Sequence, residues 1–167
     1  MSMRDRPDRL AELRRLMILD SKPERDFDEI AINLAKKIGV PITMVNLLDE
    51  SRDWFKSCAG LPISESPAIT SFCETFLDSD VAYVVSNDTT KDERFAGNPL
   101  VTGEPHIRFY AGARLVANGH TIGTLCAYDF VPRDFNEEEI ETLLVMAAAV
   151  VDMLGKRAGE TPSSVHS

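Results

Sequence analysis

Three cysteines and three histidines are the side chains of this 167-residue chain best suited to act as nucleophiles or metal ligands. Cys58, Cys73 and Cys126 lie far apart, and their odd number, without a signal for export, argues against a disulfide framework. No two Cys or His residues lie three or four positions apart, so no helical face or tight turn offers two metal ligands. We therefore expect free thiols and no zinc site.

The charge balance narrows the class of partner. Eighteen Lys and Arg residues stand against 27 Asp and Glu residues, which gives a formal net charge of -9. Such an acidic surface repels phosphate backbones and anionic lipid headgroups, so we expect no nucleic-acid or membrane partner. No apolar run approaches the roughly 20 residues of a membrane span, and the first residues lack the apolar stretch of a secretion signal. The sequence therefore predicts one cytoplasmic domain.

Three segments show the apolar spacing of amphipathic helices. The pattern predicts a helix over about residues 8–19, a second over 26–38 that begins with an Asp26–Glu29 capping box and stops at Gly39, and a third after Asn136. In the third helix Asn136 and Glu139 have the spacing of a capping box, and apolar residues form one stripe from 140 to 154. We expect the first two helices to lie side by side.

The periodicity between the second and third helices is that of strands. Asn118-Gly119 accepts positive φ at both turn centres and predicts a tight hairpin. The connecting stretches 60–80 and 87–106 are long, with a short helical piece over 72–77, and loops of this length usually cover or line a site. Residues 159–167 are predicted to form a disordered tail. Strands are expected at 41–49, 52–59, 81–86, 107–117 and 121–128, in an antiparallel sheet.

Several separated blocks of the chain, in this order, resemble the GAF domain family. They are VPITMVNLLDE (40–50), RDWFKS (52–57), SFC (71–73), DERFAGNP (92–99), RFYAGA (108–113) and GTLCAYD (123–129). The resemblance covers about residues 8–155, so residues 1–158 are expected to form one domain, similar to bacterial GAF modules found upstream of histidine kinases and diguanylate cyclases. It implies an α+β, GAF/PAS-like fold: an antiparallel sheet of five to six strands, the N- and C-terminal helices on one face, and a loop-covered pocket on the other.

The residues at the family's subtype positions disfavour the known cofactors. Cyclic-nucleotide-binding members of the family have a Phe four residues before an Asp-Glu pair. This chain has Val45 at that position. Bilin-binding members attach the pigment to a Cys commonly followed by His, whereas Glu74 follows Cys73. A haem ligand at His106 is disfavoured because a lone loop histidine is more often a surface residue. We therefore predict no cofactor.

Seven residues are candidates for the pocket. Asn46 interrupts an apolar strand, where it can contact a ligand or satisfy a backbone group. Arg108 and Tyr110 share one strand face, where they can orient an anion or lie exposed at a sheet edge. Cys73 begins a short helix, which can lower a thiol pKa, although packing is the expected role for it and for Cys126. The candidate ligand-binding residues are Asn46, Phe72, Cys73, Asp88, Phe95, Arg108 and Tyr110.

Taken together, these observations predict a freestanding, small-molecule-binding sensory module that signals by conformational change. We expect it to form a homodimer through its terminal helices or to act on a separate signalling protein. One alternative is an interaction or dimerisation module whose pocket is filled by its own side chains. Another is a thiol-based methionine sulfoxide reductase using Cys73, which is disfavoured because the family's attacking Cys would lie within residues 87–110, where this chain has none.

Overall fold

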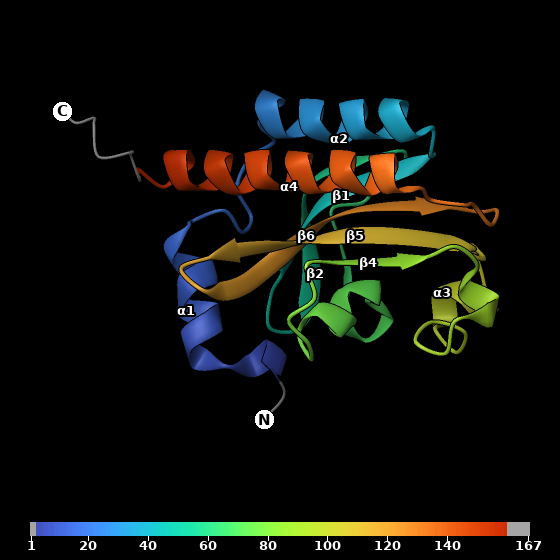
Figure 1. Ribbon diagram of the computed structural model, residues 1–167. Coiled ribbons are helices and arrows are strands. Elements are labelled where there is room, and N and C mark those ends of the chain that lie inside the picture. Colours follow the sequence, from blue (N-terminus) through green and yellow to red (C-terminus); the bar gives the residue numbers. More distant parts are fainter. Residues whose placement is uncertain (1–2, 160–167) are drawn as a thin grey trace.

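A six-stranded antiparallel sheet forms the centre of the computed structural model, which describes residues 3–159 (Figure 1). The predicted α+β fold is confirmed. The sixth strand, β3, lies inside the predicted 60–80 loop and has only three residues, too few to show an alternating pattern. The strand order is β3-β2-β1-β6-β5-β4, with β1 Ile42–Leu48, β2 Arg52–Ala59, β3 Glu65–Pro67, β4 Tyr83–Ser86, β5 Phe109–Ala117 and β6 His120–Asp129.

The hairpin of β5 and β6 turns at Asn118-Gly119, as predicted. Both residues have positive φ, 48° and 79°, and Ala117 pairs with His120 across the turn. β6 also pairs with β1, and there the two backbones approach so closely that a Cβ on Gly123 would lie 2.1 Å from the carbonyl oxygen of Asn46. Only glycine fits this position of the central strand.

Two helices, α2 (Arg25–Ile38) and α4 (Glu137–Arg157), lie together on one face of the sheet (Figure 1). The predicted capping box of α4 is confirmed, since Asn136 and Glu139 exchange side-chain-to-backbone hydrogen bonds. The predicted Asp26–Glu29 capping box is wrong: α2 begins one residue earlier, with Glu24 at the N-cap position and no side-chain cap. Gly39 ends α2 with a φ of 80°, as expected.

The N-terminal helix α1 (Pro7–Arg15) differs from its prediction in length and place. It ends at Arg15, and Met17 and Asp20 then adopt positive φ, so the helix does not continue to residue 19. It packs against β6 rather than beside α2, with Arg9 donating to the carbonyl of Thr121 at 3.2 Å. An apolar helical stripe does not specify which surface will cover it, and α2 packs on α4 instead.

Short elements cover the opposite face of the sheet. They divide the core into a helix-side cluster under α2 and α4 and a loop-side cluster under the connecting segments. The helical piece expected over 72–77 is present. The elements are the 3₁₀ helices η1 Met3–Asp5, η2 Ala68–Thr70, η3 Phe72–Phe76 and η4 Thr89–Lys91, and the short helix α3 Pro99–Thr102.

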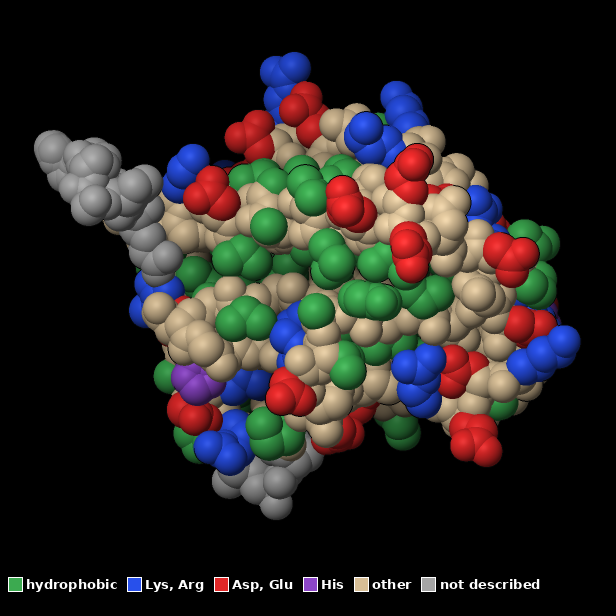
Figure 2. Space-filling view, viewed as in Figure 1, with side chains coloured by type: hydrophobic (Ala, Val, Ile, Leu, Met, Phe, Trp, Pro, Cys, Tyr) green, Lys and Arg blue, Asp and Glu red, His purple; other side chains and the backbone are tan. Residues whose placement is uncertain are grey.

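Hydrophobic side chains form a band across the helical layer in the space-filling view (Figure 2). Exposed apolar residues on α4 include Val145, Ala148 and Ala149, and Val145 is 63% exposed. Within residues 3–159, no helix combines the length and the apolar character needed to cross a membrane. Of the tail predicted over 159–167, all but Gly159 falls outside the described residues.

Candidate functional site

A buried carboxylate, Asp53 on β2, lies on the loop-covered face of the sheet. One carboxylate oxygen accepts a hydrogen bond from Arg4 at 3.0 Å, and the other accepts from Asn46 at 3.1 Å and from the Ser71 hydroxyl. These donors come from η1, from β1 and from the residue that caps η3, so one side chain joins the N-terminal segment, the sheet and the covering loop. The network therefore fixes the loop against the sheet.

Arg4 is the counter-ion of Asp53, and its own side chain is only 4% exposed. Its guanidinium also binds the Glu74 carboxylate at 2.7 Å and the carbonyl of Asp49 at 2.8 Å. Burial raises the pKa of Asp53, and the nearby charge of Arg4, with the hydrogen bonds from Ser71 and Asn46, offsets part of that rise. Asp53 therefore depends on Arg4 to stay ionised at low cost.

Cys73 extends the polar network toward β5 and β6. Its sulfur accepts from the Asn46 amide at 3.3 Å and lies 3.3 Å from the Tyr110 hydroxyl and 3.0 Å from the Thr124 hydroxyl. Cys73 has no exposed surface, and neither does Cys126. Burial raises the pKa of Cys126 well above its usual range. Both thiols are packed in the core, which is the role expected for each.

The side chain of Asn46 does not bond a backbone group, which was one of the two roles expected for it. Its amide nitrogen bonds two side chains, those of Asp53 and Cys73, and its carbonyl oxygen has no hydrogen-bond partner among the described residues. The side chain is completely buried. Asn46 is therefore an internal link of the network and does not line a cavity.

Aromatic rings fill the middle of the loop-covered face. Phe72 lies 5.0 Å from Phe95, 5.3 Å from Tyr110 and 5.6 Å from Tyr128 between ring centroids, distances typical of favourable aromatic pairs. The structure thus brings together five of the seven candidate residues in one packed cluster: Asn46, Phe72, Cys73, Phe95 and Tyr110.

The other two candidates lie apart from this cluster and hold loops in place. Asp88 caps η4 by accepting from the Thr90 amide at 3.0 Å. Arg108 donates to the carbonyls of Val101 and Ile107 at 2.9 and 3.2 Å. Its guanidinium thus binds loop carbonyls, and no hydrogen bond joins it to Tyr110 in the described residues. The anion-orienting pair suggested by the strand alternation does not form.

An apolar hollow of about 250 Å³ opens beside the aromatic cluster, between the sheet and the segments 61–72 and 100–107. Of the seven candidates only Phe72 lines it. The other lining residues carry no local signal in the sequence, because they come from separate loops and strands that meet only in the fold. The lining residues are Ile42, Met44, Asp53, Phe55, Leu61, Ile63, Ser66, Pro67, Thr70, Ser71, Phe72, Leu100, Pro105, Ile107 and Tyr128.

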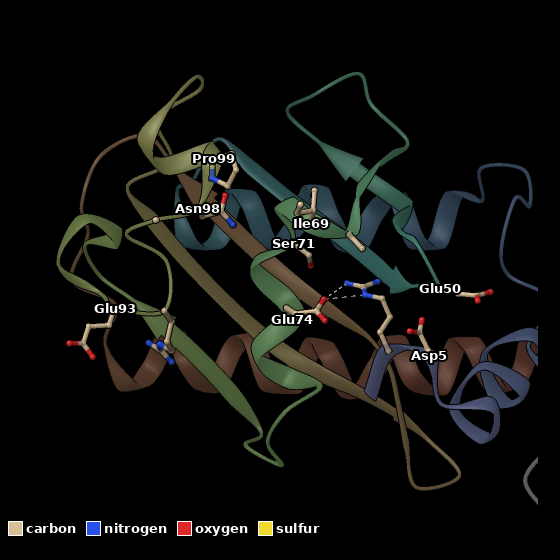
Figure 3. Close-up of a pocket in the computed structure, with 12 residues that line it drawn as sticks. Asp5, Glu50, Ile69, Ser71, Glu74, Glu93, Asn98 and Pro99 are labelled. Carbon is tan, nitrogen blue, oxygen red and sulfur yellow. Dashed lines mark hydrogen bonds and ion pairs between the residues drawn. The ribbon is translucent and has the colours of Figure 1, made fainter. Parts of the chain in front are cut away.

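A second hollow, polar and wider, lies on the other side of Ser71 and measures about 550 Å³ (Figure 3). Its two guanidinium groups are engaged by acids: Arg4 by Asp53 and Glu74, and Arg94 by Asp92. Carboxylates of Asp5, Glu50, Glu74 and Glu93 outnumber them on its walls. This hollow is therefore poorly suited to anions. Among the described residues no group of three His, Cys, Asp or Glu side chains is placed to hold a metal ion.

Comparisons with known proteins agree on one family. The family model for the GAF domain matches residues 11–152. A cyclic di-GMP phosphodiesterase from Pseudomonas aeruginosa is 38% identical over 130 residues, which make up 77% of this chain and 22% of that protein. The chain thus spans less than a quarter of this relative.

Solved structures share the fold at low sequence identity. The GAF domain of an Acinetobacter phosphoenolpyruvate-protein phosphotransferase has a TM-score of 0.68 at 22% identity, covering 93% of this chain and 98% of that one. A type II free methionine-R-sulfoxide reductase from Thermoplasma acidophilum has a TM-score of 0.63 at 12% identity, covering 78% and 91%. The chromophore-binding domain of an R. palustris bacteriophytochrome has a TM-score of 0.62 at 12% identity, covering 90% and 61%.

Proposed function

The chain belongs to the GAF domain family, sensory modules of signalling proteins, and from this premise we propose that it binds a small molecule in the apolar hollow and signals by conformational change. The observation that carries the proposal is the hollow itself. Eleven of its fifteen lining residues are hydrophobic, and it lies between the sheet and two covering segments. Concave, mostly apolar sites with a few polar groups are typical of small-molecule binding.

The sheet supplies a route from the hollow to the helices. Phe55 and Trp54 are neighbours on β2, and Phe55 lines the hollow while Trp54 belongs to the helix-side core. On β1, Met44 lines the hollow and its neighbour Val45 belongs to the helix-side core. A ligand that prefers one position of β1 and β2 would therefore favour one position of α2 and α4, by an amount set by its differential affinity for the two states.

The signal is proposed to leave through α4, by dimerisation with a second copy or by contact with a separate signalling protein. The exposed apolar residues Val145, Ala148 and Ala149 support an interface on this helix. The similarity to a cyclic di-GMP phosphodiesterase supports a role in regulating such an output. We propose a cytoplasmic location, and the acidic charge of -9 argues against nucleic acid or a membrane surface as partner.

No cofactor is included in this proposal. A cavity of about 150 Å³ is enough for benzene, and a hollow of about 250 Å³ is small for a haem or bilin. The hollow also has no Lys, Arg or His on its walls to meet the phosphate of a nucleotide. Cyclic di-GMP is therefore not the proposed ligand, although a relative acts on it.

The test is a thermal-shift screen of chemically diverse small molecules with a blocked variant beside the native chain. A ligand at 100 times its Kd stabilises the folded state by about 2.7 kcal/mol, which raises Tm by roughly 5–11 °C in a chain of this size. In the variant Leu100→Trp the added indole should occupy the hollow, and the shift should disappear. A screen without any Leu100-sensitive stabiliser contradicts the proposal.

A second candidate function is an interaction module without a ligand. The packed rings of Phe72, Phe95, Tyr110 and Tyr128 favour it, since they fill the centre of the loop-covered face. A silent ligand screen together with a stable dimer through α4 would favour this reading. Sulfoxide reduction is disfavoured by the lack of Cys in residues 87–110 and by the burial of Cys73, which leaves its thiol no access to a substrate.

A further inference from the structure

The walls of the apolar hollow indicate which chemical class of small molecule it can bind. We propose that its ligand is a small, uncharged aromatic compound that carries one N–H or O–H donor, in the chemical class of phenol and indole. This inference rests on the proposed function, because it names the class of ligand for the same hollow. Three features of the walls carry it: their charge, their size and shape, and the acceptor that Asp53 presents.

The charge of the walls excludes ionic ligands. Asp53 is the one ionisable carboxylate of the lining, and the lining includes no Lys, Arg or His. An anion would therefore lose its hydration without gaining a cation. Asp53 already has Arg4 as counter-ion at 3.0 Å, so a cationic ligand would enter next to a buried guanidinium. A neutral molecule has no charge to dehydrate and is not repelled by Arg4.

The volume and the lining favour one or two aromatic rings. The hollow of about 250 Å³ is larger than the cavity of about 150 Å³ that holds benzene. Phe55, Phe72 and Tyr128 present aromatic rings to it, and aliphatic side chains such as Ile42 and Ile107 complete the walls. Offset or edge-to-face contacts with such rings stabilise an aromatic guest beyond the area that it buries.

Asp53 supplies the polar recognition. Its carboxylate has about four lone-pair positions, and the protein fills three of them, through Arg4, Asn46 and Ser71. The remaining acceptor position is on the oxygen that accepts from Arg4, and Asp53 lines the hollow together with the hydroxyl-bearing residues Ser66, Thr70 and Ser71. A single ligand donor can satisfy it, and a hydrogen bond to a charged acceptor is among the stronger ones in proteins.

Isothermal titration calorimetry with phenol, toluene and benzoate tests the inference. Phenol and toluene have nearly the same shape but differ in the donor, and benzoate adds a negative charge. We expect phenol to bind about tenfold more tightly than toluene and benzoate not to bind. Leu100→Trp should abolish phenol binding, while Val131→Trp, at a residue 55% exposed and outside the hollow, should leave it unchanged.

The outcomes separate this inference from the proposed function. Equal affinity for phenol and toluene, tighter binding of benzoate, or phenol binding that survives Leu100→Trp overturns the ligand class. If the thermal-shift screen still finds another Leu100-sensitive stabiliser, the sensory proposal stands. If neither the three probes nor the screen gives a Leu100-sensitive response, both proposals fail.

Discussion

Replacing Arg4 by Met tests how the N-terminal segment holds the loop-covered face. Methionine keeps much of the length and apolar volume of the side chain but removes the charge and all hydrogen bonds of the guanidinium. Asp53 then remains only 3% exposed, without its counter-ion. Glu74, whose side chain is 43% exposed, can be hydrated instead, so the cost falls mainly on Asp53.

The expected loss of stability is large for a residue so near the chain start. Removing one partner of a buried ion pair typically costs about 3–5 kcal/mol. For a domain of this size the same loss lowers Tm by roughly 6–20 °C. Arg6→Met is the matched control, because Arg6 and its partner Asp8 have side chains that are each 50% exposed. We expect the control to change stability by less than about 0.5 kcal/mol.

The loss should also depend on pH. The folded-state pKa of Asp53 lies above its usual value of 3.8 because of burial. The folded state therefore binds this proton more tightly than the unfolded state does. The cost of ionising Asp53 in the folded state is absent below pH 3.8, and it grows as pH rises through the folded-state pKa. Without Arg4 that pKa rises further, so Arg4→Met should lose more stability at pH 8 than at pH 5.

Urea unfolding followed by the fluorescence of Trp54, the single tryptophan, measures both effects. Adding Asp53→Asn to Arg4→Met should recover part of the stability at pH 8, because it removes the unpaired charge. The reasoning is refuted if Arg4→Met is as mild as Arg6→Met, if its cost is the same at both pH values, or if the second substitution recovers nothing.

Three further predictions concern the sheet, the thiols and the helical face. Gly123→Ala should lower the free energy of unfolding by at least about 2 kcal/mol, because its Cβ meets a backbone oxygen at 2.1 Å, whereas Gly97→Ala, with no atom within 4 Å, should have little effect in the same urea assay. An aromatic disulfide reagent should react with Cys58 before the other two thiols, which are fully buried, although burial raises the pKa of Cys58 and slows this reaction too. Equally fast reaction of Cys73 would restore the reductase hypothesis. Val145→Glu should shift a dimer to monomers in sedimentation while changing stability by less than about 0.5 kcal/mol, and a monomeric native chain would contradict a homodimer through α4.

Features encoded by neighbouring residues could be predicted from the sequence. The capping box of Asn136 and Glu139 and the turn at Asn118-Gly119 depend on residues within four positions of one another, and both are present. The alternating strands and the GAF-like blocks were sufficient for the fold class. The Asp26 capping box does not form because α2 begins at Arg25, which places Asp26 inside the first turn and not at the N-cap.

The site was less predictable because it depends on contacts between distant segments. Arg4 and Asp53 are 49 residues apart, and in the sequence each stands among other charged residues, as a surface residue would. Cys73 and Tyr110 were expected to line a pocket, yet they fill the space under η3, and the hollow opens beside them. Residue type alone cannot distinguish a ring that lines a cavity from one that occupies it.

Xenon derivatisation of crystals tests most directly whether the loop-covered face contains an accessible apolar site. Xenon enters dry apolar cavities and needs no hydrogen-bond partner. We expect a xenon peak in contact with Ile42, Phe55 and Ile107, and no peak there in Leu100→Trp crystals. A hollow closed by the 61–72 segment, or one filled by ordered waters that xenon does not displace, would contradict it.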